Sequence, residues 1–198
     1  MSFVEKAKLV EALFASLEKE ITSLKDETGI YCVENCIYCC TTPKVVATVL
    51  EFYPLAVYLY ETGQAESFLE RIKQNGTSTI CPVLNSDGSR GPRLGCSEYA
   101  VRGLICRLFA FNYSTDKHGI RKIATCKKIK ITQPETITKA NNLLLERPVG
   151  PKASGYYSQL QSIDFTEGQT LYPIAEAIRI AIEKVLTYYY YLNIEEGK

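Results

Sequence analysis

One short stretch of this sequence constrains the fold more than any other: residues 32–40 read CVENCIYCC, with four cysteines in nine positions. Thiolates repel one another, so several of them within about 4 Å are stable only if a cation or metal cluster neutralises their charge. Burial as small apolar side chains gives no reason for such crowding. The run therefore predicts thiolate ligands for a soft metal, and the fold has to bring further ligands to it.

The other cysteines lie in the same part of the chain. The eight are Cys32, Cys36, Cys39, Cys40, Cys81, Cys96, Cys106 and Cys126. We predict all eight as metal ligands, although Cys81 and Cys126, taken singly, are equally compatible with plain burial. The single histidine, His118, falls in a predicted turn and ranks below every cysteine as a ligand. No catalytic residue can be assigned.

The cysteine spacing leaves the metal open between iron and zinc. Cys32, Cys36 and Cys39 suit three corners of an iron–sulfur cube, with a fourth cysteine from elsewhere. Their spacing also matches the CxxxCxxC loop of radical S-adenosylmethionine enzymes, but those resemble a partial barrel of alternating strands and helices, which this sequence does not predict. Two zinc ions with four thiolates each would use all eight cysteines.

Apolar residues at helical spacing predict that most of the chain is helical. In residues 2–25 they fall mostly three or four positions apart, and Gly29 ends the pattern. Residues 107–126 predict a β-hairpin with its turn at 116–119, and residues 75–94 a long loop. Further helices are predicted at 45–63 with a kink or restart at Pro54, and at 66–73, 134–146, 155–161 and 173–192.

The predicted fold class is therefore mainly α with a small β-hairpin. We expect a single compact helical domain over residues 1–198, organised around a cysteine-ligated metal centre. Residues 30–130 form the cysteine-cluster core of this domain, and residues 134–198 its C-terminal helical part. A chain of 198 residues can bury such a core without disulfides.

Charge and hydropathy exclude some classes of partner. The net charge of +1, with no face rich in Lys and Arg, argues against nucleic acid. No stretch of about 18 apolar residues occurs and the N-terminus lacks a signal-peptide pattern, so we expect no membrane span and a cytoplasmic protein. A reducing cytosol also keeps thiols available for metal. A protein partner or substrate is expected, but neither its identity nor the oligomeric state follows from the residues.

Three pieces of the sequence together resemble a known family. They are the run at 32–40, the Cys81-Pro82 step, and GCSEYAVRGLICRLFAF at 95–111. In combination they are similar to the YkgJ-type, or CxxCxxCC, family of zinc- or iron-chelating proteins, which includes sequences labelled flagellin lysine N-methylase. The resemblance covers about residues 30–130. Two positions depart from the family pattern: the first cysteine gap is three residues rather than two, and Gly103 stands where a proline usually follows Arg102.

The resemblance implies cysteine-bound zinc or iron and, through the methylase-labelled members, an iron–sulfur cluster, with 4Fe-4S favoured. One alternative is a structural zinc (Zn2+) module for protein interaction. Another is an S-adenosylmethionine-dependent protein lysine N-methylase-like enzyme, although no Gly-rich nucleotide loop follows a predicted strand. Arg107, directly after Cys106, is predicted as a cofactor-binding residue that hydrogen-bonds to a cluster sulfur or offsets thiolate charge.

Overall fold

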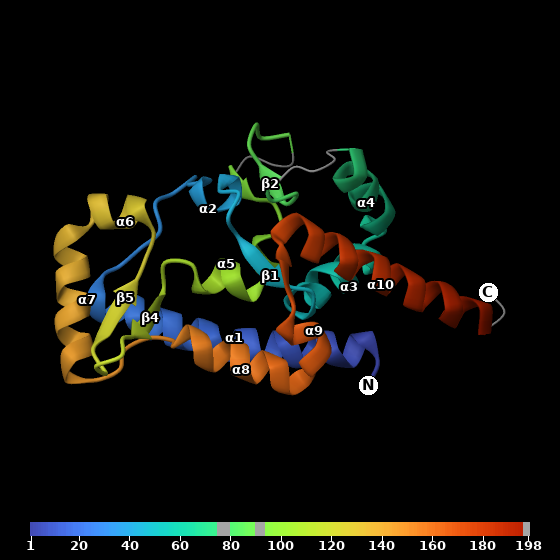
Figure 1. The fold of residues 1–198 in the computed structure, drawn as a ribbon. Coiled ribbons are helices and arrows are strands. Elements are labelled where there is room, and N and C mark those ends of the chain that lie inside the picture. The colour runs from blue at the N-terminus through green and yellow to red at the C-terminus, as the bar shows by residue number, and fades with distance from the viewer. Residues whose placement is uncertain (75–79, 90–93, 196–198) are drawn as a thin grey trace.

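The first helix shows how closely local sequence determines local structure. In the computed structural model, which describes residues 1–74, 80–89 and 94–195, helix α1 (Phe3–Thr28) runs along one side of the molecule (Figure 1). Ser2 caps its first turn in a capping box with Glu5. Gly29 ends the helix in the left-handed conformation, with φ of 78°, which glycine adopts without steric cost.

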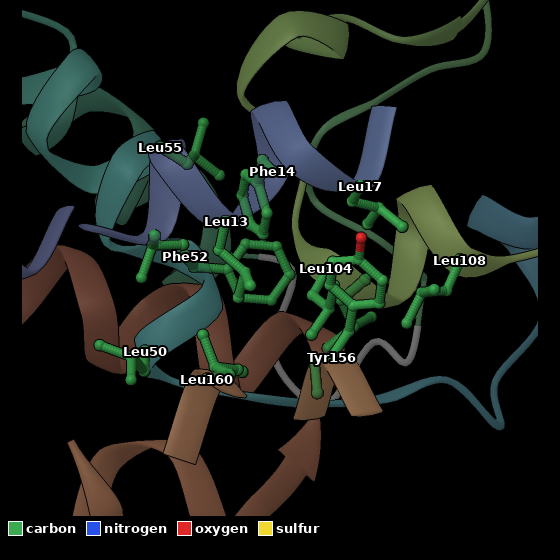
Figure 2. Packing of buried hydrophobic residues seen from close by; sticks show 14 of the residues in the cluster. Leu13, Phe14, Leu17, Leu50, Phe52, Leu55, Leu104, Leu108, Tyr156 and Leu160 are labelled. Atoms are coloured by element: carbon green, nitrogen blue, oxygen red, sulfur yellow. The ribbon is translucent and has the colours of Figure 1, made fainter. Parts of the chain in front are cut away.

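The apolar face of α1 forms one wall of the core. Its buried side chains recur mostly every three or four residues and pack against helices α3 (Tyr53–Glu61), α7 (Pro134–Glu146) and α8 (Ala153–Ile163). Figure 2 shows Leu13, Phe14 and Leu17 of α1 beside Phe52 and Leu104. The helices are α1, α2 (Tyr38–Thr41), α3 (Tyr53–Glu61), α4 (Ala65–Gln74), α5 (Leu104–Leu108), α6 (Lys127–Thr132), α7 (Pro134–Glu146), α8 (Ala153–Ile163), α9 (Phe165–Gln169) and α10 (Ile174–Glu195), with 3₁₀ turns η1 (Leu50–Phe52) and η2 (Tyr99–Val101).

The strands form small antiparallel pairs. They are β1 (Val46–Thr48) with β6 (Leu171–Pro173), β2 (Leu84–Asn85) with β3 (Gly95–Cys96), and β4 (Asn112–Thr115) with β5 (Arg121–Ala124). The β4–β5 pair is the predicted hairpin, with Asp116 and Gly119 in its turn. It is shorter than the predicted range of 107–126, because residues 107 and 108 belong to helix α5 and the first strand begins only at Asn112. The mainly helical fold class with a small hairpin is thus confirmed.

One predicted helix was wrong. Residues 45–50 do not begin a helix: Val46–Thr48 form β1, and α3 starts only at Tyr53 with Pro54 in its first turn. The β-branched residues of β1 pair with Leu171–Pro173, a partner more than 120 positions away that local periodicity cannot anticipate. The predicted loop at 75–94 is covered only in part, because residues 75–79 and 90–93 lie outside the described residues. Within the described part the prediction missed strand β2, since its partner β3 lies about ten positions further along the chain.

Within the described part of the chain, no helix combines the length and the apolar character required to cross a bilayer.

Candidate metal centre

All eight cysteines line one cavity, of about 110 Å³. They reach it from five places in the chain: the α2 region, the turn before β2, strand β3, helix α5 and the residue before α6. Cys81 is buried, Cys32 is exposed, and the other six are partly buried. Among the described residues no three Cys, His, Asp or Glu side chains already stand in the geometry of a closed metal cage. The thiols thus surround a space rather than converge on one point.

A buried glutamine connects the first cysteine to the last. Gln133 accepts the N–H of Tyr31 at 3.1 Å and donates to the Tyr31 carbonyl at 2.7 Å. Gln133 ends α6, and Cys126 caps the start of α6, where its sulfur accepts the N–H of Ile129 at 3.4 Å. This two-way amide contact holds the chain just before Cys32 against the helix that Cys126 begins. Sequence reasoning missed Gln133, since a polar residue between two helices carries no local signal.

Backbone hydrogen bonds bring Cys81 and Cys96 to the α2 region. The N–H of Cys81 donates to the Cys40 carbonyl at 3.0 Å. Three residues on, Leu84 pairs with Cys96 across β2 and β3, and the N–H of Ser97 donates to Val83 at 2.9 Å. Two short strands that bury little apolar surface of their own therefore fix two of the thiols beside a third.

A buried carboxylate positions the helix that carries Cys106. Glu51 is completely buried and accepts the N–H of Ile105 at 2.7 Å, at the first turn of α5. It also accepts the N–H of Thr48 at 2.7 Å and the Thr48 hydroxyl at 3.1 Å. Burial raises the pKa of Glu51 to about 7, although these hydrogen bonds act in the opposite direction. Sequence reasoning missed this residue as well; the available signal was a lone acid in an apolar stretch.

The thiols make one another harder to ionise. Partial desolvation of the thiol raises the pKa of Cys32, although the residue as a whole is exposed, and the nearby thiols of Cys36, Cys39 and Cys126 raise it further. The hydrogen bond with Cys39 lowers the pKa of Cys40, but its hydrogen bond with Cys81 and its burial raise it more, to about 12. A soft cation among these sulfurs would supply the missing charge compensation. The donor set therefore fits a thiophilic metal.

Two arginines lie near the cavity in different ways. Arg102 lines it, together with Cys96 and Glu98. Arg107 is not among the lining residues: its guanidinium donates to Glu18 at 2.5 Å and to the carbonyls of Ala100 and Arg102, and it stacks on Phe14 at 4.4 Å. The cofactor-binding role of Arg107 stays a prediction. His118 lies exposed in the hairpin turn, away from the lining residues.

Steric crowding explains why residue 103 is a glycine in this chain. A Cβ atom there would lie 2.7 Å from Cε1 of Phe52 and 3.0 Å from Oε2 of Glu51. We expect Gly103→Ala to lower the free energy of unfolding by about 1 to 3 kcal/mol, because the Phe52 ring has to move within a packed core. Urea unfolding would measure the change.

Two further variants make this prediction specific. Phe52→Leu in the same chain should recover part of the loss caused by Gly103→Ala, because it frees space at the new methyl group. Gly155→Ala, in helix α8 with no atom within 4 Å of its added Cβ, should be neutral or slightly stabilising. Equal losses at positions 103 and 155 would contradict the steric explanation.

Comparison with known proteins agrees with this chemistry. Residues 31–140 match the model of the CxxCxxCC family, described as "Putative zinc- or iron-chelating domain". No curated protein and no solved structure matches the chain. The matched segment spans more than half of the 198 residues and contains all eight cysteines that line the cavity. The chain therefore belongs to the CxxCxxCC family.

Proposed function

We propose that this protein binds metal through the cysteines of the cavity, and that the bound centre is an iron–sulfur cluster of the 4Fe-4S type. The observation that carries the proposal is the meeting of eight thiols from five segments around one cavity. Membership of a zinc- or iron-chelating family supports cysteine-bound metal. The choice of iron rests on the spacing of Cys32, Cys36 and Cys39, which suits three corners of a cube.

The cavity provides suitable surroundings for such a centre. Its volume of about 110 Å³ is several times the 10 to 15 Å³ or so that a single water needs, so a centre of several atoms can enter. Apolar side chains, among them Phe52, Leu55 and Ile105, form much of the wall. In this site the thiolates would hold the metal and the apolar wall would limit access of water, which affects the reduction potential of a bound cluster.

The first experiment is to purify the protein without oxygen and to measure its metal content. We expect brown protein with broad visible absorption, containing iron and acid-labile sulfide, as iron–sulfur chromophores require. Colourless protein with stoichiometric zinc would instead favour the structural zinc module, which needs only closed four-thiolate sites. Protein that binds neither metal, even after reconstitution with iron and sulfide or with zinc, would contradict the proposal.

A further inference from the structure

Two arginines share one carboxylate where α1 packs against α5 (Figure 1). Arg102 donates to Oε1 of Glu18 at 2.8 Å, and Arg107 donates to the same oxygen at 2.5 Å. A guanidinium group stays charged at any physiological pH, so one negative charge here faces two positive ones. Within this group of three side chains, one positive charge is left uncompensated.

The Arg107 guanidinium is used to hold the backbone. It donates to the carbonyls of Ala100 at 2.5 Å and Arg102 at 3.0 Å, and it stacks on Phe14 of α1. Arg107 is buried, and it does not occur among the described residues that line the cavity. Its contacts therefore fix the chain at the end of η2, which is the segment that presents Arg102.

The Arg102 guanidinium is held firmly at the wall of the cavity. Besides its bond to Glu18, it donates to the Tyr99 carbonyl at 2.8 Å and lies over the Tyr99 ring, 3.8 Å from the centroid. Its side chain is only 12% exposed. Arg102 lines the cavity together with Cys96 and Cys106. A charge fixed in a place with little water acts more strongly on its neighbours than the same charge in open solvent.

A cysteine-bound centre in this cavity would need a positive charge beside it. Four thiolates leave a net negative charge after a divalent cation has bound, and the thiolates of an iron–sulfur cluster likewise make the site anionic. Among the described residues that line the cavity, Arg102 is the only Lys, Arg or His, and Glu98 is the only Asp or Glu. The wall thus contains one group that attracts an anionic centre and one that repels it.

We propose that Arg102 compensates the charge of the metal-bound thiolates, and that Arg107 is a positioning residue that acts through Arg102. Arg107 was predicted for the first of these roles from its place after Cys106, but its guanidinium is engaged elsewhere. This inference rests on the proposed function, because it assumes a metal centre in the cavity. It does not depend on which cysteines bind, since Arg102 acts on the charge of the whole centre.

The test compares the Co2+ affinity of single variants in anaerobic titrations of the full-length, reduced and metal-free protein. Bound Co2+ reports thiolate ligation by its visible spectrum. Arg102→Gln removes the charge, and we expect it to raise the dissociation constant about tenfold. Arg102→Lys should recover part of this loss, because it keeps the charge but not the planar fork that contacts Glu18 and Tyr99.

Glu98→Gln is the matched control, because it removes a charge of opposite sign from the wall of the same cavity. It should bind Co2+ at least as tightly as the wild type, since a repulsive charge is gone. Loss of Co2+ affinity in both Arg102→Gln and Glu98→Gln would mean that the two residues only support the fold of the wall. That result would overturn the proposed role of the Arg102 charge.

Arg107→Gln tests the division of roles between the two arginines. It should lower the urea midpoint of the metal-free protein more than Arg102→Gln does, because it leaves buried carbonyls without donors. Its effect on Co2+ affinity should be the smaller of the two, and a larger effect would overturn the assignment. Circular dichroism checks that each variant folds. If one does not, Arg102→Met or Arg107→Lys takes its place.

The outcomes separate this inference from the proposed function. Wild-type Co2+ affinity in Arg102→Gln overturns the inference while metal binding stands. If the protein accepts only a reconstituted iron–sulfur cluster, the reduction potential is measured instead. Arg102→Gln should then lower it and Glu98→Gln raise it, because reduction adds negative charge, and unchanged potentials overturn the inference. Failure of the wild type to bind Co2+, Zn2+ or a reconstituted cluster would refute metal binding itself.

Discussion

Removing the bound metal should lower the free energy of unfolding by about 4 kcal/mol, if the free metal was previously at about 1,000 times its dissociation constant. The expected size follows from mass action, because the metal binds the folded arrangement of thiols and the unfolded chain offers no such arrangement. Urea unfolding of the same reduced protein, with metal and after chelation, would measure the loss. Equal midpoints in the two states would contradict a metal centre that contributes to the fold.

Removal of the metal should also change the rates of amide hydrogen exchange unevenly along the chain. Strands β2 and β3 have two residues each and α2 is a single turn, so these segments bury little apolar surface of their own. The core face of α1, by contrast, is buried against α3 and α8. Hydrogen exchange should therefore speed up around Cys40, Cys81 and Cys96 after chelation and change little in α1. Uniform acceleration throughout the chain would indicate instead that the metal is needed for the whole core.

The sequence was informative where a signal is local. Helix α1 was predicted to begin near Ser2 and to end at Gly29, because its apolar spacing lies within the helix and its C-cap glycine directly follows it. The hairpin of β4 and β5 was likewise predicted from its turn. Strand β1 was not, since its partner β6 lies far along the chain and strand pairing of that range leaves no local pattern.

The sequence predicts which atoms of the candidate site bind metal, but it does not predict how the segments that carry them are arranged. The crowding of cysteines identifies sulfur as the donor, and the structure brings all eight to one cavity; their role as ligands stays a prediction. The residues that hold the cysteine-bearing segments in place are different in kind. Gln133 and Glu51 act through hydrogen bonds to Tyr31 and Ile105, more than 50 positions away in each case, and such contacts appear only once the chain is folded.

The stability of the metal-free protein should fall as the pH rises from about 4.5 to 7, and Glu51 should be the cause. Burial raises the pKa of Glu51 from its usual 4.5 to about 7 in the folded protein. Between these values the folded state holds a proton that the unfolded chain has already lost, so raising the pH favours unfolding. Below about 4.5 both states are neutral at this group, and above about 7 both are charged. A shift of this size corresponds to roughly 3 kcal/mol.

Replacing Glu51 with glutamine should remove this pH dependence. The side-chain amide cannot ionise, and it accepts through one oxygen only, so the N–H of either Thr48 or Ile105 loses its acceptor. We therefore expect Glu51→Gln to be less stable than the wild type at pH 5, by the cost of one unsatisfied buried donor, about 1 to 3 kcal/mol. By pH 7.5 the wild type should lose roughly 3 kcal/mol relative to the variant, because only the wild type has to ionise a buried acid. The two proteins should then be about equally stable, or the variant should be the more stable one.

The measurement is urea unfolding of chelated, reduced protein at several pH values between 5 and 7.5. Comparing wild type and variant at each pH cancels the contribution of the thiols, which both proteins share. Glu70→Gln, an exposed acid on α4, is the matched control and should follow the wild-type pH dependence. Parallel stability curves for the wild type and Glu51→Gln would mean that burial does not hold a proton on Glu51. Its role would then be limited to accepting the hydrogen bonds that position α5 and Cys106.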